Sequence, residues 1–279
     1  FIRGFKVNFF QLKYLIINIK NKSSKIFGQR NFLKLYLNDY FQNIDYYIVS
    51  YPNSGRTWLY KILSLYSHKL NSQNNIENRK LVKFDDKFIK FVHDSSDPNP
   101  YPLKVLNFKN KDIINKKKII LLRDPRDVIV SFWYQMSFRE NTYKKDISQF
   151  IDDEYFGIKK LISFYNLINL ELTNDFKVIT YEMLLKNTFE EVKKIIYFFN
   201  LKIDENLIKN CIIDCSFKNL QKEETKTLKN QDNKSMKFRN GTSGNFKNEL
   251  NIHDNLKIND MIKNRLNNNF KKILNLENI

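Results

Sequence analysis

The sequence contains few cysteines, glycines and prolines, and it has no long hydrophobic run. Two cysteines, Cys211 and Cys215, are too few for a disulfide framework or for the four ligands of a structural zinc, so we expect a reducing compartment and a cytoplasmic location. Six glycines and five prolines exclude collagen-like and low-complexity chains. The apolar runs have only strand length, so we predict no membrane span. Because the chain begins at Phe1 rather than Met, an upstream anchor is kept as an alternative.

The rest of the composition is that of a globular protein with a strong positive charge. Hydrophobic residues make up 42% of the 279 positions, and the net charge is +18. Such a charge suits nucleic acid or an acidic membrane surface. However, only nine of the 48 basic residues are arginine, and abundant Lys, Asn, Ile, Phe and Tyr are typical of an A+T-rich genome. We therefore favour compositional bias and expect no nucleic-acid partner.

A strand, a loop and a helix follow one another three times along the chain. A β-prone run over 46–50 precedes a turn and a helical pattern that begins near residue 56. The order recurs after 118–122 and again after 178–180, where a helical pattern covers 182–199. This alternation predicts an α/β fold with three layers, in which helices flank a central parallel β-sheet.

The organisation of the chain is simple at this level. Residues 1–40 mix lysine with apolar residues and predict an N-terminal helical extension, whereas 41–279 predict a single globular domain. We find no internal repeat of fixed period and no linker. Residues 221–250 show no clear periodicity and are expected to be irregular.

Residues 51–58, YPNSGRTW, lie where a predicted strand ends and a predicted helix begins. At such a junction the backbone N–H groups and the helix dipole point at a common spot, which favours an anion. The pattern differs from the nucleotide-triphosphatase loop GxxxxGK[ST], because no lysine follows Gly55. Taken alone, the segment is equally well explained as a Ser-Gly turn that caps a helix.

Residues 121–133, LLRDPRDVIVSFW, hold Arg123 at a predicted strand end and Ser131 eight residues later. If the loop between them folds back, both side chains donate to one phosphate. The alternative is a helix start with Asp124 as N-cap and Pro125 as first residue, beside a solvated arginine. The two interpretations are compatible.

A third segment, residues 237–250, places two glycines within four residues, beside Arg239 and Lys247. Such a loop can lay N–H groups and cations over a ligand, although by itself the signal is weak.

Together and in this order, the three segments resemble the sulfotransferase family that uses 3′-phosphoadenylyl sulfate (PAPS). Residues 51–58 are similar to the family's 5′-phosphosulfate loop YPKSGTTW, 121–133 to its 3′-phosphate motif, and 237–250 to its RKGxxGxWK loop. The resemblance covers roughly 46–250 and implies a doubly wound fold related to the P-loop kinases. It also implies these donor-binding positions: Asn53, Ser54, Gly55, Arg56, Thr57, Trp58, Arg123, Ser131, Tyr181, Phe217, Arg239, Asn240 and Gly241.

His93 is the candidate general base. It follows a short β-prone run, at the place where the family carries its base, and it is one of only three histidines. A neutral imidazole accepts a proton at physiological pH, which typically contributes ~10²- to 10⁴-fold to a rate. An isolated histidine is more often structural, so this assignment depends on the donor loops on either side.

The sequence departs from the family pattern at several positions. Asn53 replaces the lysine of the first loop, which approaches the bridging oxygen in the family, and losing such a donor typically costs ~10²- to 10³-fold in rate. We hypothesise that Arg56, in place of a threonine, compensates. Asn240 and Phe246 replace a lysine and a tryptophan of the third loop. The family's dimer motif is matched only by Lys247, so we do not predict that dimer, and the oligomeric state stays open.

The resemblance implies transfer of a sulfuryl group from PAPS to a hydroxyl or amine of a small-molecule or carbohydrate acceptor, without a metal. The alternatives are a catalytically impaired nucleotide-binding relative, a basic nucleic-acid-binding protein and, less favoured, a nucleoside kinase. The sequence does not identify the acceptor.

Overall fold

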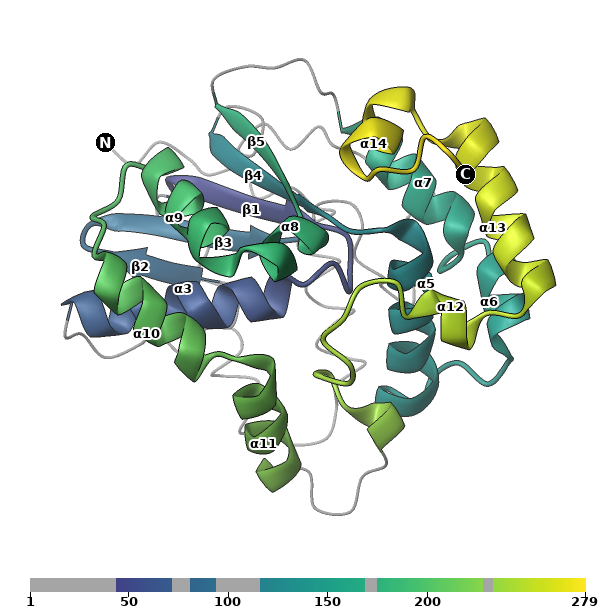
Figure 1. Ribbon diagram of the computed structural model, residues 1–279, viewed down its shortest axis with the longest axis horizontal. Coiled ribbons are helices and arrows are strands. Elements are labelled where there is room, and N and C mark those ends of the chain that lie inside the picture. The colour runs from purple at the N-terminus through teal and green to yellow at the C-terminus, as the bar shows by residue number, and fades with distance from the viewer. Residues whose placement is uncertain (1–43, 72–80, 94–115, 169–174, 228–232) are drawn as a thin grey trace, which may run out of the picture. The chain divides into compact units, whose positions relative to one another are not determined.

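Figure 1 shows the protein as a computed structural model, which describes residues 44–71, 81–93, 116–168, 175–227 and 233–279. Residues Ile44–Ile279 form one compact unit. The helical extension expected over 1–40 lies outside the described residues, and the domain boundary at residue 41 stays a prediction. Every helix in the described part of the chain falls short of the length and hydropathy that a bilayer crossing requires.

A single sheet of five strands in the order β2-β3-β1-β4-β5 runs through the described residues. The strands are β1 (Tyr46–Ser50), β2 (Leu81–Phe84), β3 (Lys87–Val92), β4 (Lys117–Leu122) and β5 (Phe176–Thr180). Strand β1 is parallel to β3 and β4, and β4 is parallel to β5, which confirms the predicted parallel arrangement for these four. The edge strand β2 is antiparallel to β3, because a two-residue turn joins them and a parallel pair needs a longer crossover.

The sheet separates two hydrophobic cores. Successive side chains of a strand point to opposite faces, so Val49 of β1 lies in one core and Ile48 in the other, as do Ile120 and Ile119 of β4. Helices on both faces complete the three predicted layers (Figure 1). The first core is covered by α5 (Pro125–Tyr134), α6 (Ile147–Asp152), α7 (Ile158–Leu167), α13 (Ile252–Arg265) and α14 (Asn268–Ile273), and the second by α3 (Arg56–Asn71), α8 (Tyr181–Lys186), α9 (Thr188–Phe198) and α10 (Glu205–Asp214).

The start of α5 confirms the predicted cap. The Asp124 side chain accepts a hydrogen bond from the N–H of Arg126 at 2.9 Å, and Pro125 occupies the first helical position. Arg126 turns back onto Asp124, with 2.7 Å between Nη2 and Oδ2. This arginine therefore completes the cap.

Two local expectations differ from the structure. The helical pattern over 182–199 is divided at Asn187, whose side chain accepts from the N–H of Glu190 and so caps α9. Residues 221–227, expected to be irregular, belong to α11 (Phe217–Thr227). The remaining short elements are the π-helix η1 (Gln135–Arg139), the 3₁₀ turn η2 (Asn233–Ser235) and α12 (Phe246–Glu249).

Candidate active site

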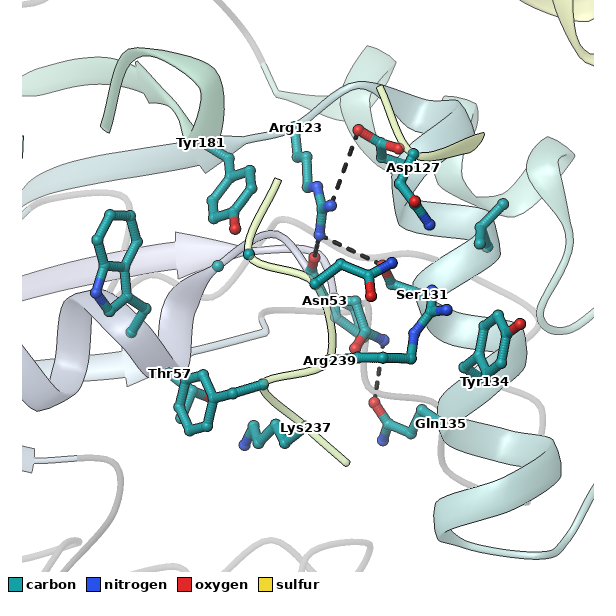
Figure 2. A pocket seen from close by; sticks show the side chains of 18 of the residues that line it. Asn53, Thr57, Arg123, Asp127, Ser131, Tyr134, Gln135, Tyr181, Lys237 and Arg239 are labelled. Atoms are coloured by element: carbon teal, nitrogen blue, oxygen red, sulfur yellow. Dashed lines mark hydrogen bonds and ion pairs between the residues drawn. The ribbon is translucent and has the colours of Figure 1, made fainter. Parts of the chain in front are cut away.

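A cavity of about 480 Å³ opens at the carboxyl ends of four parallel strands. Its wall includes residues that directly or closely follow β1, β3, β4 and β5, namely Pro52, His93, Arg123 and Tyr181. In open α/β sheets, ligands bind at this edge because the loops that leave it converge there. Figure 2 shows part of the cavity at close range.

The structure brings the predicted site residues together, with one exception. The cavity is lined by Asn53, Gly55, Arg56, Thr57, Trp58, His93, Arg123, Ser131, Tyr181, Phe217, Arg239, Asn240 and Gly241. Ser54 is fully buried and lies outside this lining. Its N–H donates to the carbonyl of Tyr51 at 3.4 Å. The expected contact of the Ser54 hydroxyl with a ligand stays a prediction.

The loop between β1 and α3 has the backbone geometry of an anion cradle. Asn53 and Gly55 adopt φ angles of 64° and 92°, which turn the chain sharply into α3 at Arg56. A Cβ on residue 55 would lie 2.4 Å from the ring of Tyr181, so only glycine fits there. In the first turn of α3 the N–H of Trp58 donates back to the carbonyl of Gly55 at 3.0 Å, and the N–H groups before it lie at the positive end of the helix dipole. The loop therefore presents donors to the cavity.

Arg123 joins the three predicted segments at one point. Its Nη1 donates to the carbonyl of Asn53 at 3.0 Å and lies 3.4 Å from the Ser131 hydroxyl (Figure 2). Its Nη2 donates to the carbonyl of Thr242 at 3.3 Å. Its guanidinium stacks 4.3 Å from the ring centroid of Tyr181. The structure thus confirms the prediction that the side chains of Arg123 and Ser131 lie close together.

Asp127 fastens the third segment over this arginine. The carboxylate is 1% exposed and accepts hydrogen bonds from the N–H of Gly244 at 2.7 Å and the N–H of Phe246 at 3.0 Å. It also lies 3.8 Å from Nη2 of Arg123. Residues 242–246 are thus tied to the first turn of α5, which fixes the height of the loop above the cavity.

Gly241 makes room for an aromatic ring at the cavity wall. Its φ is 64°, and a Cβ there would lie 2.4 Å from the ring of Phe217. Trp58 lies on the α3 side, where its indole N–H donates to the carbonyl of Cys215 at 3.0 Å and its ring meets Tyr181 edge to face. Flat apolar surfaces of this kind suit a planar heteroaromatic base.

Arg239 is held against α5 by a ring and a carboxylate. Its guanidinium lies 3.6 Å from the ring centroid of Tyr134, and Nη1 donates to Oε1 of Glu249 at 2.7 Å. The Tyr134 hydroxyl donates to the other carboxylate oxygen at 2.8 Å. Tyr134 stands three residues after Ser131 and so shares its face of the helix.

His93 stands at the end of β3, and its environment selects one tautomer. Its Nδ1 lies 2.8 Å from the carbonyl oxygen of Ser50. A carbonyl only accepts, so at this distance Nδ1 carries the proton, and the neutral ring keeps the basic lone pair on Nε2. This is the form that a general base requires.

Two departures from the family pattern have structural consequences. Asn53 holds a left-handed φ that asparagine tolerates better than lysine, and its Nδ2 donates to Oε1 of Gln135 at 3.0 Å. The loop is therefore tied to η1 by an amide pair. Arg56 is the first residue of α3 and lines the cavity, as its proposed compensating role requires.

Basic side chains outnumber acidic ones in the cavity wall. The basic residues are Arg56, Arg123, Arg139, Lys237 and Arg239, and the acidic ones are Asp127 and Glu140. This balance suits an anionic ligand that carries more than one negative charge. Within the described residues, no three His, Cys, Asp or Glu side chains are grouped as metal ligands. Reaction without a metal stays a prediction.

Burial keeps Tyr181, in the cavity wall, and its neighbour Glu182 in their neutral forms over a wider pH range. It raises the pKa of Tyr181, an effect that the nearby Arg123 partly offsets. Burial also raises the pKa of Glu182, whose Oε1 accepts from the N–H of Asp124 at 3.0 Å. Tyr181 therefore meets Arg123 as a neutral aromatic ring at physiological pH.

Sequence reasoning missed several residues of this site. The residues Asp127, Tyr134, Gln135 and Glu249 each contact a predicted residue or its loop, yet the sequence analysis gave none of them a role. For two of them the spacing in the sequence was a usable signal. Asp127 follows Arg123 by four residues and Tyr134 follows Ser131 by three, and both lie on α5. Gln135 and Glu249 carried no such signal.

Comparison with curated proteins finds relatives at low identity. The chain is 26% identical over 198 residues to an amine sulfotransferase of Oryctolagus cuniculus, which covers 63% of each protein. It is also 26% identical over 200 residues to sulfotransferase 2A1 of Homo sapiens, covering 64% of this chain and 67% of the relative. The chain thus spans about two thirds of the length of the curated relatives it matches.

Solved structures share the fold. Mouse sulfotransferase SULT7A1, complexed with PAP, superposes with a TM-score of 0.60 at 16% identity and covers 84% of this chain and 89% of its own. A retinol dehydratase in complex with androsterone and the inactive cofactor PAP gives a TM-score of 0.56 at 16% identity, with 82% of each chain covered. The family model of the sulfotransferase domain matches residues 43–270. The chain therefore belongs to the sulfotransferase family.

Proposed function

We propose that this chain transfers a sulfuryl group from PAPS to a hydroxyl or amine of a small-molecule or carbohydrate acceptor, leaving adenosine 3′,5′-bisphosphate (PAP). One observation carries the proposal: Arg123 and Ser131 converge in the same cavity that receives the N-terminus of α3. Two donor groups in one cavity, the Arg123–Ser131 pair and the N-terminus of α3, suit a nucleotide with two separate phosphate groups.

The residues present fit such a nucleotide. The turn at Gly55 and the first N–H groups of α3 would hold the 5′-phosphosulfate, together with Thr57 and Arg56. Arg123, Ser131 and Arg239 would hold the 3′-phosphate. Trp58 and Phe217 would flank the adenine, with Tyr181 beside them. Asn240 and Gly241, in the third segment, would line the same donor site. PAPS would supply the sulfuryl group and a stable leaving phosphate.

His93 would remove the proton of the acceptor. The bond between Nδ1 and the Ser50 carbonyl orients the ring and leaves the proton-accepting position on Nε2. Arg56 would offset charge on the leaving oxygen in place of the lysine replaced by Asn53. If Arg56→Ala left turnover unchanged while Asn53→Lys raised it sharply, this compensation would be wrong.

The acceptor class is the coarsest part of the proposal. Two relatives are named for amine and hydroxysteroid acceptors, which supports a small-molecule acceptor. Both cysteines are buried free thiols, in keeping with a reducing, cytoplasmic location. No nucleic-acid partner is part of the proposal.

The test is transfer of radioactive sulfate from labelled PAPS to a panel of phenols, hydroxysteroids, arylamines and sugars. We expect transfer to at least one class, abolished in His93→Ala while PAP binding is kept. A wild-type protein that binds PAP and labels no acceptor would favour the impaired relative. Binding of RNA that falls steeply with salt and is unaffected by Arg123→Ala would favour the nucleic-acid alternative.

A further inference from the structure

Glu249 sits at the centre of a compact polar group behind the cavity. The carboxylate accepts from Nη1 of Arg239 at 2.7 Å, from the hydroxyl of Tyr134 at 2.8 Å and from Nδ2 of Asn245 at 3.1 Å. Burial raises the pKa of Glu249, but these hydrogen bonds outweigh it and leave the pKa below its usual range. The carboxylate is therefore ionised at neutral pH.

These contacts restrain the arginine in two directions. The Arg239 Cζ lies over the ring of Tyr134, 3.6 Å from the ring centroid, so the ring limits movement of the guanidinium toward α5. The carboxylate holds one edge through Nη1. The Arg239 and Glu249 side chains are only 18% and 21% exposed, so the pair is largely shielded from solvent. Figure 2 shows Arg239 beside Tyr134, on the side of α5 that carries Ser131.

A guanidinium has five donors, and the bond to Glu249 uses one. The remaining edge stays available to a ligand in the cavity that Arg239 lines. Without the carboxylate, the long side chain would sample several rotamers, and fixing one of them on binding would cost conformational entropy. Because the ion pair with Glu249 forms when the protein folds, the Arg239 side chain is already ordered before a ligand binds.

We propose that Glu249 is a positioning residue, which orients Arg239 for the 3′-phosphate of the donor nucleotide before that nucleotide binds. The inference rests on the proposed function and gives a role to a residue that none of the three motifs assigns. Glu249 acts through Arg239 and does not touch the nucleotide.

The substitution Glu249→Gln tests the hydrogen bonds of residue 249 separately from its negative charge. With its oxygen toward Arg239 and Asn245 and its NH₂ toward the hydroxyl of Tyr134, a glutamine at 249 satisfies all three partners, because a tyrosine hydroxyl also accepts. Glu249→Gln therefore keeps the orientation and removes a negative charge near the phosphate. Glu249→Ala removes both.

The experiment is calorimetric titration of wild type, Glu249→Ala, Glu249→Gln and Arg239→Ala with PAP and with 5′-AMP, which lacks the 3′-phosphate. Asn248→Ala, exposed on the same helix α12, is the matched control. For PAP, we expect Glu249→Ala to raise Kd about tenfold, equivalent to about 1.4 kcal/mol, and Glu249→Gln to bind at least as tightly as wild type. Affinity for 5′-AMP should not change. In the Arg239→Ala background, Glu249→Ala should have no further effect.

Three results would overturn the inference. They are an unchanged PAP affinity in Glu249→Ala, an equal loss for PAP and 5′-AMP, and a Glu249→Gln variant as weak as the alanine variant. The second would indicate a general folding role, which the melting temperature of each variant also checks. If wild type itself fails to bind PAP, the proposed function fails instead, so the two failures are distinguishable.

Discussion

The replacement of Asp127 by asparagine tests how the third loop is held over the cavity. The carboxylate is 1% exposed and accepts two backbone N–H groups, those of Gly244 and Phe246. An asparagine side chain has one oxygen, so its NH₂ group must face one of these N–H donors. The substitution loses one hydrogen bond to a charged acceptor, worth about 1.5–3 kcal/mol, and leaves a buried N–H without an acceptor. It also removes the charge 3.8 Å from Arg123.

We therefore expect Asp127→Asn to lower the free energy of unfolding by about 2–4 kcal/mol, measured by urea denaturation followed by circular dichroism. The melting temperature should fall by about 2–4 °C for each kcal/mol. Asp152→Asn is the control, because Asp152 is about half exposed and pairs only with Lys257 in the described structure, so its loss should cost about 0–1 kcal/mol. Equal stability of Asp127→Asn and wild type, within about 0.5 kcal/mol, would refute the reasoning.

Further predictions concern the ring contact, the base and the thiols. Gly241→Ala should weaken PAP binding at least tenfold by calorimetry, whereas Gly244→Ala, with a similar φ but open space at its Cβ, should weaken it less; equal losses would exclude the Phe217 contact as the cause. His93→Ala should lower turnover by ~10²- to 10⁴-fold and leave the Kd of PAP unchanged, and a parallel loss of both would contradict its role as base. Burial raises the pKa of Cys215 to about 12, so the thiol stays protonated at pH 8.5, and iodoacetamide should label it in urea and not in the native protein.

Local patterns predicted the parts of the fold that depend on near neighbours in the chain. The run 46–50 forms β1 as expected, because a β-prone run and a following turn are properties of a short segment. Arg123 and Ser131 are eight residues apart, so one loop and two helical turns bring them together. The cap at Asp124 is equally local. For these residues sequence spacing determines spatial arrangement.

The features that sequence did not predict depend on long-range contacts. Asp127 meets Gly244 across 117 residues, and Tyr134 meets Glu249 across 115, so no local pattern distinguishes these side chains from other polar residues. Strand β2 was missed because its partner is β3 and its four residues form too short a pattern. The full burial of Ser54 was likewise not predicted from the motif, because a motif specifies residue types and not their exposure.

The central claim is that this cavity binds a nucleotide with both a 5′- and a 3′-phosphate. The most direct test is the melting temperature with and without PAP, which requires no knowledge of the acceptor. PAP at ~100 times its Kd should stabilise the fold by about 2.7 kcal/mol and raise the melting temperature by several degrees. This shift should disappear in Arg123→Ala and be absent with ATP. A well-folded wild-type sample whose melting temperature does not change with PAP would contradict the account.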